Sequence, residues 1–516
     1  MTESKHANPV DNSPETSPKD ISRSFGGQMV FYVLAEWIFR LRGFIIIPIL
    51  SRLLGTQGYG LVSSLTSLGG LAQAAVAMGL STAIKIFIPG LPQPQRQREF
   101  WGVLQVSTWL SIILVGGMLL FYSPIRAATL PNEMTLGLFI PGVLLIPVNT
   151  VHLLLRGQIV NQKESQAYSI IVSQTSVIEI LLYIGGGLWA GALGVLYAMV
   201  FTLLLRNAMM IRLIIREDKF VLLIPNMLAE VQKYYVYGLS LMILSLASWV
   251  VNSSDRLIIG RFLGSAALGV YDVPYNITNR VNGIVPIFAA LMPFVAEAVN
   301  TGKTEVAKRY LEGTYKVLLS IYVPVTIYLI LNRLDIVLLL SSEAFIEGAA
   351  YMPFVAIGVV FWQLSGVYNY NIHAHKRGQL LIIPMVIAGL FNLGFNYLLV
   401  PRYGAVAAAI STALTFGLIF FMNRIISNRI LKVRLDPQFL PKALISFLGF
   451  GATVWVTLRL TAPWHPIWRV GLSAATGGSV YLGLILLLKL FKPQEMRYFE
   501  SLFRSLLPQL KKNRKV

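Results

Sequence analysis

Long apolar stretches, separated by short polar ones, run along almost the whole chain. A helix needs about 20 mostly apolar residues to span the hydrocarbon core of a bilayer. The stretches that meet this requirement predict an all-α integral membrane protein with fourteen transmembrane helices, at 28–50, 58–82, 101–122, 135–155, 167–188, 193–212, 235–254, 267–296, 315–333, 348–371, 379–400, 404–423, 439–461 and 468–490.

Composition agrees with this interpretation. The chain has 516 residues, of which 55% are hydrophobic and only 13% are charged, whereas soluble domains carry about 25% charged residues. The chain contains no cysteine, which excludes disulfides, iron–sulfur clusters and thiolate zinc sites. His373 and His375 lie in a polar loop where a solvated pair is the simpler interpretation. We therefore expect no metal and no cofactor, apart from coupling to H⁺ or Na⁺.

An internal repeat sets the architecture. The stretch from Arg52 to Gly60 returns 209 residues later as Arg261 to Gly269, and each copy joins two apolar segments. A second pair, which begins at Gly194 and Gly404, lies 210 residues apart. The repeat equates helices 1–6 with helices 7–12. Because six is even, both lobes enter the membrane in the same direction, related by a pseudo-two-fold axis along the membrane normal. Parallel repeats of this kind are a transporter architecture, with the substrate path between the lobes.

The repeat and the composition divide the chain into six parts. The ends are rich in polar or basic residues, which predicts a disordered start and an amphipathic, basic end on the inner leaflet. The predicted parts are a disordered cytoplasmic tail at 1–24, an N-lobe at 25–215, a cytoplasmic inter-lobe loop at 216–233, a C-lobe at 234–425, two extra helices at 426–490, and a basic amphipathic cytoplasmic tail at 491–516.

The formal net charge of +20 is a topology signal rather than a sign of nucleic-acid binding. Of the 43 Lys and Arg residues, 32 lie on one side of the predicted helices and 8 on the other. Cytoplasmic loops carry the excess of Lys and Arg. The distribution predicts a multi-pass protein of the inner (plasma) membrane with both termini in the cytoplasm.

Charged residues inside the predicted helices are the candidate functional residues. A charge at mid-bilayer costs about 2.5–3.5 kcal/mol, so it normally faces a bundle interior or a watery cavity. The first helix carries Glu36, Arg40 and Arg42. Glu36 and Arg40 are one turn apart and can pair on one face, while Arg42 points away from them. Glu179 lies near the centre of the helix at 167–188.

The predicted helix at 267–296 carries a polar stripe. Asp272, Asn276 and Arg280 recur every four residues, and Asn279 lies beside them. At 1.5 Å per residue, Arg280 lies about 12 Å deeper than Asp272, near the midplane. We expect Asp272, Asn276 and Asn279 to line a polar cavity between the lobes.

Two interpretations of these charges stay open. Arg42 and Arg280 have no carboxylate one turn away, which favours the holding of an anion such as phosphate, while Glu36 and Glu179 are candidates for coupling to an ion. Alternatively, the charges pair with one another and hold the lobes together. Asp255 and Arg256 form such a candidate pair at an outer helix end, where we expect only slight burial.

Four stretches carry a resemblance to a known family: Ser51 to Leu61, Met78 to Lys85, Asp255 to Gly264 and Leu399 to Ala405. Together they resemble the Wzx-type flippases of lipid-linked oligosaccharides, such as O-antigen units of lipopolysaccharide, within the multidrug/oligosaccharidyl-lipid/polysaccharide exporter (MOP) superfamily. The likeness covers helices 1–12.

The resemblance implies a carrier, not an enzyme, which moves an undecaprenyl-diphosphate-linked oligosaccharide between leaflets by alternating access of two lobes. Cations of a central cavity would hold the diphosphate, a role that falls here on Arg40, Arg42, Lys85 and Arg280. The implied partners are the lipid-linked oligosaccharide, membrane lipids, a polysaccharide polymerase and a chain-length regulator, and no nucleic acid.

Rival functions remain. A drug/cation antiporter of the same superfamily would favour internal acids over arginines, and a lipid II flippase would share fourteen helices and a cationic cavity. A major-facilitator carrier would share the parallel repeat, but its basic signature is missing after the second helix. A membrane glycosyltransferase, polymerase or ligase needs a catalytic acid or base in an outer loop, and the close acidic pair outside is Glu343 and Glu347.

Overall fold

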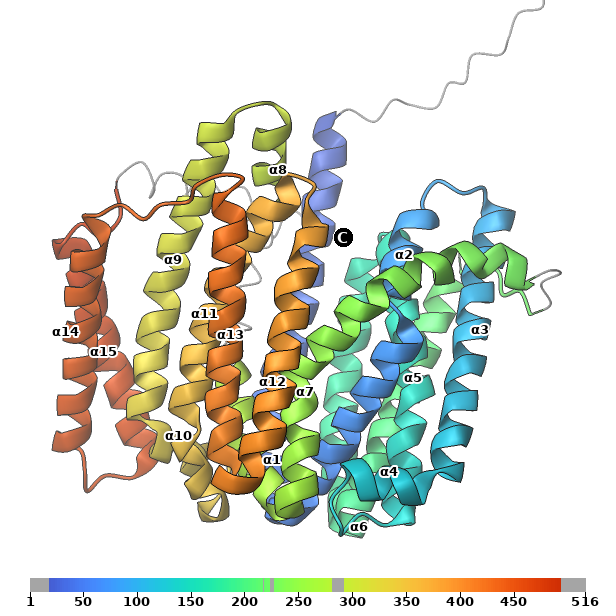
Figure 1. Ribbon diagram of the computed structural model, residues 1–516, viewed down its shortest axis with the longest axis horizontal. Coiled ribbons are helices and arrows are strands. Elements are labelled where there is room, and N and C mark those ends of the chain that lie inside the picture. The colour runs from blue at the N-terminus through green and yellow to red at the C-terminus, as the bar shows by residue number, and fades with distance from the viewer. Residues whose placement is uncertain (1–17, 217, 223–226, 281–291, 493–516) are drawn as a thin grey trace, which may run out of the picture.

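The computed structural model describes the backbone of residues 18–216, 218–222, 227–280 and 292–492, and side chains within these ranges from Arg42 onward, Pro293 excepted. The predicted all-α fold is confirmed, because every regular element in the described part of the chain is a helix. Figure 1 shows two helical bundles side by side, with α2–α6 in one and α8–α13 in the other. The first bundle lies in the predicted N-lobe and the second in the predicted C-lobe.

The N-lobe contains six helices. They are α1 Pro18–Ala77, α2 Leu80–Phe87, α3 Gln93–Leu120, α4 Tyr122–Thr129, α5 Leu136–Asn161 and α6 Ser165–Ile214. The helix α1 begins inside the segment 1–24 that the sequence predicts as a tail. The rest of that tail, and residues 493–516 of the C-terminal one, lie outside the described residues.

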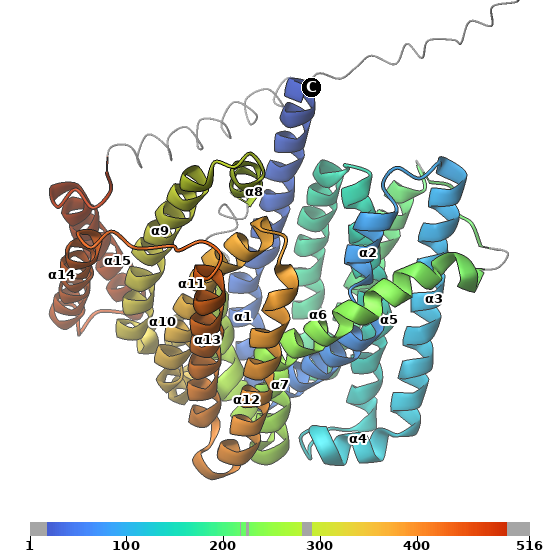
Figure 2. The ribbon, with the colours of Figure 1, turned by 45° about the horizontal axis from the view of Figure 1, so that its top comes forward.

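The C-lobe and the two extra helices complete the chain. They comprise α7 Met227–Asn279, α8 Met292–Asn300, α9 Thr304–Leu331, α10 Arg333–Leu340, the short 3-10 helix η3 Glu343–Ala350, α11 Met352–Ala374, the 3-10 helix η4 Gly378–Leu381, α12 Ile382–Tyr403, α13 Ala405–Asn428, α14 Phe439–Leu460 and α15 Pro466–Leu487. Both views show α14 and α15 at the outer edge of the C-lobe, beside α9 (Figures 1 and 2).

Three of the long helices are broken by a glycine that turns the chain back. Gly55 in α1 and Gly264 in α7 have φ values of 62° and 87°, and Gly191 in α6 has a φ of 56°. L-residues with a Cβ avoid this region, so glycine is the natural residue there. The described chain has eleven long apolar helical stretches. Three of them are each divided into two segments by these glycines, which is consistent with the fourteen predicted crossings.

The structure corrects the second repeat pair, Gly194 and Gly404. Gly55 and Gly264 are 209 residues apart, as predicted. The residue that breaks α6, however, is Gly191 rather than Gly194, and its equivalent between α12 and α13 is Gly404, with a φ of 72°. Lys163 and Lys376 end α5 and α11 with the same φ of 59°, which gives the same offset of 213 residues as Gly191 and Gly404. The offset between the lobes therefore grows from 209 to 213 along the chain.

The two copies of the first repeat pack directly on one another. A Cβ on Gly60 would lie 1.8 Å from the carbonyl oxygen of Ser265, and a Cβ on Gly269 would lie 2.0 Å from that of Thr56. Each contact is the image of the other at the 209-residue offset, as in an isologous interface. The pseudo-two-fold axis thus passes between α1 and α7, the helices that join the lobes.

Candidate functional site

A cluster of charged residues lies inside the N-lobe, where α1 packs on α6. The carboxylate of Glu179 accepts hydrogen bonds from Arg42 of α1, from Arg206 of α6 at 2.9 Å, and from the Tyr183 hydroxyl at 2.7 Å. Arg206 also donates to Thr175 at 2.8 Å. The side chains of Arg42, Arg206 and Glu179 are only 12%, 3% and 6% exposed. These charged side chains are therefore buried within the protein rather than exposed to the lipid of the bilayer.

A third guanidinium reaches this cluster from the other side of the lobe boundary. A Cβ on Gly43 would lie 2.2 Å from Cζ of Arg280, so the Arg280 guanidinium lies flat against the α1 backbone next to Arg42. Arg206 and Arg280 are also electrostatic neighbours of Arg42. Arg42 and Arg206 thus hold the Glu179 carboxylate, and Arg280 lies next to Arg42. We call these four residues the arginine cluster.

A second polar network lies directly on the interface between the lobes. Asp272 accepts from Ser63 at 2.7 Å and from Arg256 at 2.8 Å. Ser63 and Asp272 are 209 residues apart, so two equivalent positions of the repeat meet at the axis. Arg256 also bonds Asp255 at 2.9 Å and lies 4.2 Å above the ring of Tyr275, a favourable cation–π distance.

Tyr59 of α1 connects the two groups. Its electrostatic neighbours are Asp272, Arg280 and Arg256, and Asn276 lies within hydrogen-bonding range of its hydroxyl. A continuous polar track therefore follows the lobe boundary from Arg256 to the arginine cluster. This track separates helices that are otherwise apolar.

Further basic residues lead from the arginine cluster through the N-lobe. His152 of α5 contacts Asn207 at 3.1 Å and has Arg206, Arg156 and Arg42 as electrostatic neighbours. Arg156 is in turn the neighbour of Lys85, which is exposed on α2.

The structure brings some of the predicted site residues together and separates others. Arg42 and Arg280 meet, and Glu179 lies between Arg42 and Arg206. Asp272 and Asn276 lie on the interface track, and Asn279 is the half-buried last residue of α7. Lys85 is apart from the cluster. The side chains of Glu36 and Arg40 lie outside the described residues.

Two features of the site differ from what the sequence suggests. Asp255 and Arg256 are 4% and 8% exposed, so the expectation of slight burial is wrong, because the C-lobe and N-lobe enclose this helix end. Arg206 is missing from the predicted site because the topology count treats it as an inner-end cation. Its position inside the apolar stretch 193–212 is the signal that could have identified it.

Two cavities are lined by the C-lobe and the helices that follow it, and neither lining includes a residue of the arginine cluster. One of about 540 Å³ is lined by residues of α9, α11, α13 and the segment before α14. A smaller one of about 190 Å³ lies beside it. Among the described residues, no three His, Cys, Asp or Glu side chains group as metal ligands.

Comparison with known families gives two matches. The sequence profile of the family described as polysaccharide biosynthesis protein matches residues 27–299, more than half of the chain. The MatE profile matches residues 240–398. Among curated proteins, the uncharacterized membrane protein MJ1068 of Methanocaldococcus jannaschii is 24% identical over 262 residues. That match spans 50% of this chain and 50% of the relative's length.

Solved structures share the fold. The lipid II flippase MurJ in an inward closed conformation has a TM-score of 0.69 and 14% identity, over 88% of this chain and 98% of that one. A MATE transporter of Vibrio cholerae has a TM-score of 0.50 and 12% identity, over 80% and 97%. At these identities the likeness concerns the fold alone.

Proposed function

Since the chain belongs to the polysaccharide biosynthesis protein family, we propose that it is a flippase for polyprenyl-diphosphate-linked oligosaccharides. In this proposal it moves undecaprenyl-diphosphate-linked repeat units across the inner membrane, by alternating access of its two lobes and without catalysing a covalent reaction. The fold, shared with a lipid II flippase over 88% of this chain, supports a transporter.

The arginine cluster is the observation that carries the proposal. Guanidinium groups bind phosphate oxygens through two parallel hydrogen bonds, and charge-assisted bonds of this kind are the strong ones. Arg42 and Arg206 belong to the N-lobe, whereas Arg280 belongs to the C-lobe and reaches across to α1. A diphosphate bound among them would contact both lobes, so that its binding and release would be sensitive to their relative movement. The polyprenyl chain can remain in lipid throughout.

Glu179 gives the cluster a way to couple transport to an ion. In this structure its carboxylate forms ion pairs with Arg42 and Arg206. A diphosphate would need the guanidinium groups of these two residues. We propose that a proton taken up by Glu179 frees these guanidinium groups for the substrate, and that loss of the proton returns them to Glu179 as the substrate leaves. Glu36 remains a second candidate for ion coupling.

The outlying residues have supporting roles in the proposal. Lys85 and Arg156 would attract the diphosphate at the cytoplasmic end of the N-lobe, and Arg40 would add a further cation on α1. Asp272, Asn276 and Asn279 would form the polar wall of the path once the lobes separate. A polysaccharide polymerase and a chain-length regulator remain the proposed protein partners, with both termini of the chain in the cytoplasm.

A lipid II flippase is the second candidate function. The extensive match to MurJ, with a TM-score of 0.69, favours it, and its substrate would place the same diphosphate chemistry among the arginines. A drug/cation antiporter fits less well, because a site with three guanidinium groups around one carboxylate repels a cationic drug.

The function can be tested in cells that depend on this protein to export a lipid-linked glycan. Arg42→Gln, Arg280→Gln and Arg40→Gln should each reduce export about tenfold or more, the effect of losing one charge-assisted hydrogen bond. Arg402→Gln, at an exposed arginine of α12, is the matched control. Export is normalised to the amount of folded protein in the membrane. Unchanged export in Arg280→Gln and Arg42→Gln, at normal protein levels, would refute the proposal. Complementation of a strain lacking its lipid II flippase would instead support the second candidate.

A further inference from the structure

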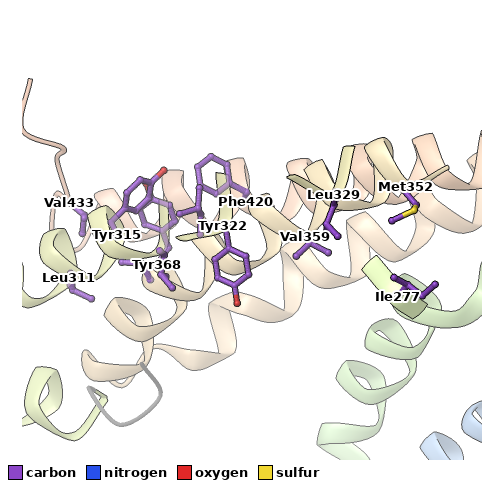
Figure 3. Packing of buried hydrophobic residues seen from close by; sticks show 14 of the residues in the cluster. Ile277, Leu311, Tyr315, Tyr322, Leu329, Met352, Val359, Tyr368, Phe420 and Val433 are labelled. Atoms are coloured by element: carbon purple, nitrogen blue, oxygen red, sulfur yellow. The ribbon is translucent and has the colours of Figure 1, made fainter. Parts of the chain in front are cut away.

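The C-lobe contains a cationic cavity that the transport mechanism does not use. It has a volume of about 540 Å³ and is lined by Tyr315, Tyr368, Arg424, Asn428, Lys432, Val433, Arg434, Leu435 and Leu440. Figure 3 shows Tyr315 and Tyr368 beside Val433 at one end of the packed C-lobe core. This end joins the start of α9, the end of α13 and the start of α14, which the distribution of Lys and Arg assigns to the cytoplasmic face.

The lining has the chemistry of an anion site. It presents three cationic side chains and two phenol rings whose centroids are 5.9 Å apart. Arg424 is an electrostatic neighbour of both tyrosines. In the described part of the chain, no carboxylate forms an ion pair with Arg424, Lys432 or Arg434.

Two carboxylates lie nearby, and neither forms an ion pair with a cation of the lining. Glu312 accepts from the backbone N–H of Arg434 at 2.9 Å. Asp436 pairs with Lys492 at 2.6 Å and with Lys316 at 3.9 Å, in the smaller adjacent cavity. The larger cavity therefore keeps a net positive lining.

At the corresponding place the N-lobe has apolar residues. The helices α3 and α9 have the same length and lie 211 residues apart, so Tyr315 corresponds to Leu104. At the offset of 213, Tyr368 corresponds to Leu155 and Arg424 to Ile211. These three N-lobe residues pack together in one apolar cluster. At these equivalent positions the C-lobe thus presents polar side chains where the N-lobe presents apolar ones.

The segment that follows each lobe's last helix differs in charge. In the N-lobe it delivers Asp218, a fully buried carboxylate that accepts from Arg96, Gln158 and Gln162. In the C-lobe, Asn371 takes the place of Gln158 and donates to the Leu431 carbonyl at 3.1 Å. At the same offset Leu431 takes the place of Asp218, and Lys432 takes the place of Lys219. The N-lobe supplies its own anion here, and the C-lobe does not.

We propose that this cavity binds the phosphoryl group of an anionic membrane lipid, at a site separate from the arginine cluster and independent of transport. Arg424 and Lys432 would hold the phosphoryl oxygens, and the hydroxyl groups of Tyr315 and Tyr368 would bond the neighbouring ester or glycerol oxygens. The volume lies within the range of about 300–1,000 Å³ typical of ligand sites.

Lipid rather than a soluble phosphate is the source that the surroundings favour. Leu440 lines the cavity and is itself 49% exposed, and Leu444 one turn along α14 is 57% exposed. On α13, Phe421 and Ile425 are 51% and 57% exposed. The helix α14 packs on α9 and α15, so these apolar faces of α13 and α14 flank the cavity on the bilayer side. Acyl chains can therefore lie against them while the headgroup enters.

Native mass spectrometry of the purified full-length chain in detergent tests this proposal. The probe is dioleoyl phosphatidylglycerol, with dioleoyl phosphatidylcholine as the zwitterionic comparison. We expect the double variant Arg424→Gln/Lys432→Gln to weaken the binding of phosphatidylglycerol about tenfold or more. The matched control Arg429→Gln/Arg377→Gln removes two exposed cations of the same face and should change binding less than about twofold.

A second variant keeps the test decisive if charge removal disturbs folding. Tyr315→Leu/Tyr368→Leu installs the residues of the N-lobe and should weaken binding while the thermal unfolding temperature is retained. Inorganic phosphate and pyrophosphate are added as competitors. Weak competition by these anions supports a lipid as the ligand. Displacement of phosphatidylglycerol by an equal concentration of either anion would overturn the lipid proposal and indicate a soluble phosphate as the ligand. Equal losses in the cavity and control variants, or no loss in the cavity variants, would overturn the site.

Discussion

The two lobes share one scaffold but bury opposite kinds of polar chemistry in their cores. In the N-lobe, Glu179 is held by Arg42 and Arg206. At the offset of 213, Glu179 corresponds to Asn392 of the C-lobe, which bonds the side chains of Ser254, Ser411, Thr415 and Asn396. At this pair of equivalent positions, the N-lobe has a buried ion cluster and the C-lobe has a neutral hydrogen-bond network.

The difference suggests a division of labour. A neutral amide with satisfied hydrogen bonds fixes its helices in one arrangement. A buried ion cluster responds to a proton or to an anionic ligand, because either one changes the pairing of its arginines. We therefore interpret the N-lobe as the responsive half and the C-lobe core as the rigid half. Three changes of sequence test this interpretation.

Removal of the Glu179 charge should have the largest effect on thermal stability. Glu179→Gln leaves Arg42 and Arg206 enclosed without their carboxylate, and breaking a buried pair in this way costs about 3–5 kcal/mol of stability. We expect a markedly lower unfolding temperature in detergent. Adding Arg206→Met should restore part of the loss, since it removes one of the uncompensated charges.

The C-lobe provides the matched control for Glu179. Asn392→Asp introduces a charge into the neutral network, and we expect it to destabilise the protein rather than to create a second responsive site. If Glu179→Gln unfolded at the temperature of the native protein, the ionic core would not be a structural element, and the comparison of the lobes would lose its basis.

Substitution of the two glycines at the contact between the lobes should have an intermediate effect on thermal stability. Gly60→Ala and Gly269→Ala each place a methyl group about 2 Å from a backbone carbonyl of the other repeat, and overpacking of this kind costs about 1–3 kcal/mol. Because the contacts are symmetric, the two variants should lose similar amounts of thermal stability. Gly116→Ala is the control, since a Cβ there meets nothing within 4 Å. Clearly unequal losses would show that the pseudo-symmetry does not extend to energetics.

The smallest effect on stability is expected at Asp436, an acidic residue at the C-lobe surface. The hydrogen bond from Lys492, helped by the Gln438 backbone N–H, holds the pKa of Asp436 below its usual value of 3.8. A lowered carboxyl pKa adds stability above the unfolded pKa, and this stability is lost as the pH falls through the folded pKa. Asp436→Asn should therefore be slightly less stable than the native protein at neutral pH and equal to it at acidic pH. Thermal melts between pH 3 and 7 measure this, and a difference that persisted at the acidic end would contradict the assignment.

Much of the fold follows from local sequence. Fourteen apolar stretches of sufficient length predicted the fourteen crossings, because membrane thickness sets helix length. The first repeat pair was also predicted, since Gly55 and Gly264 both carry the backbone turn. The second pair was misplaced by three residues. Gly191 and Gly194 both fit the pattern, but Gly194 instead lets α6 pack closely, with its Cβ position 1.9 Å from the Gly186 carbonyl oxygen.

The site depends on contacts that sequence does not reveal. The sequence identified Arg42, Arg280 and Glu179 as internal charges, but their pairing joins residues as far as 137 positions apart. Arg206 was missed because it was counted as an inner-end cation, and its partner Glu179 lies 27 residues away on the other half of α6. The cationic cavity combines residues of α9, α11 and α13, which no periodicity in a single helix can indicate. The transport roles of the site residues remain predictions.

Reconstitution into vesicles tests the central claim most directly. Purified protein is placed in liposomes that carry a fluorescent polyprenyl-diphosphate oligosaccharide, and its passage between leaflets is followed with a quencher that does not cross the membrane. The account predicts rapid passage with the native protein, loss of passage in Arg42→Gln/Arg280→Gln, and no movement of a cationic dye. Movement of the cationic dye without movement of the diphosphate lipid would contradict it.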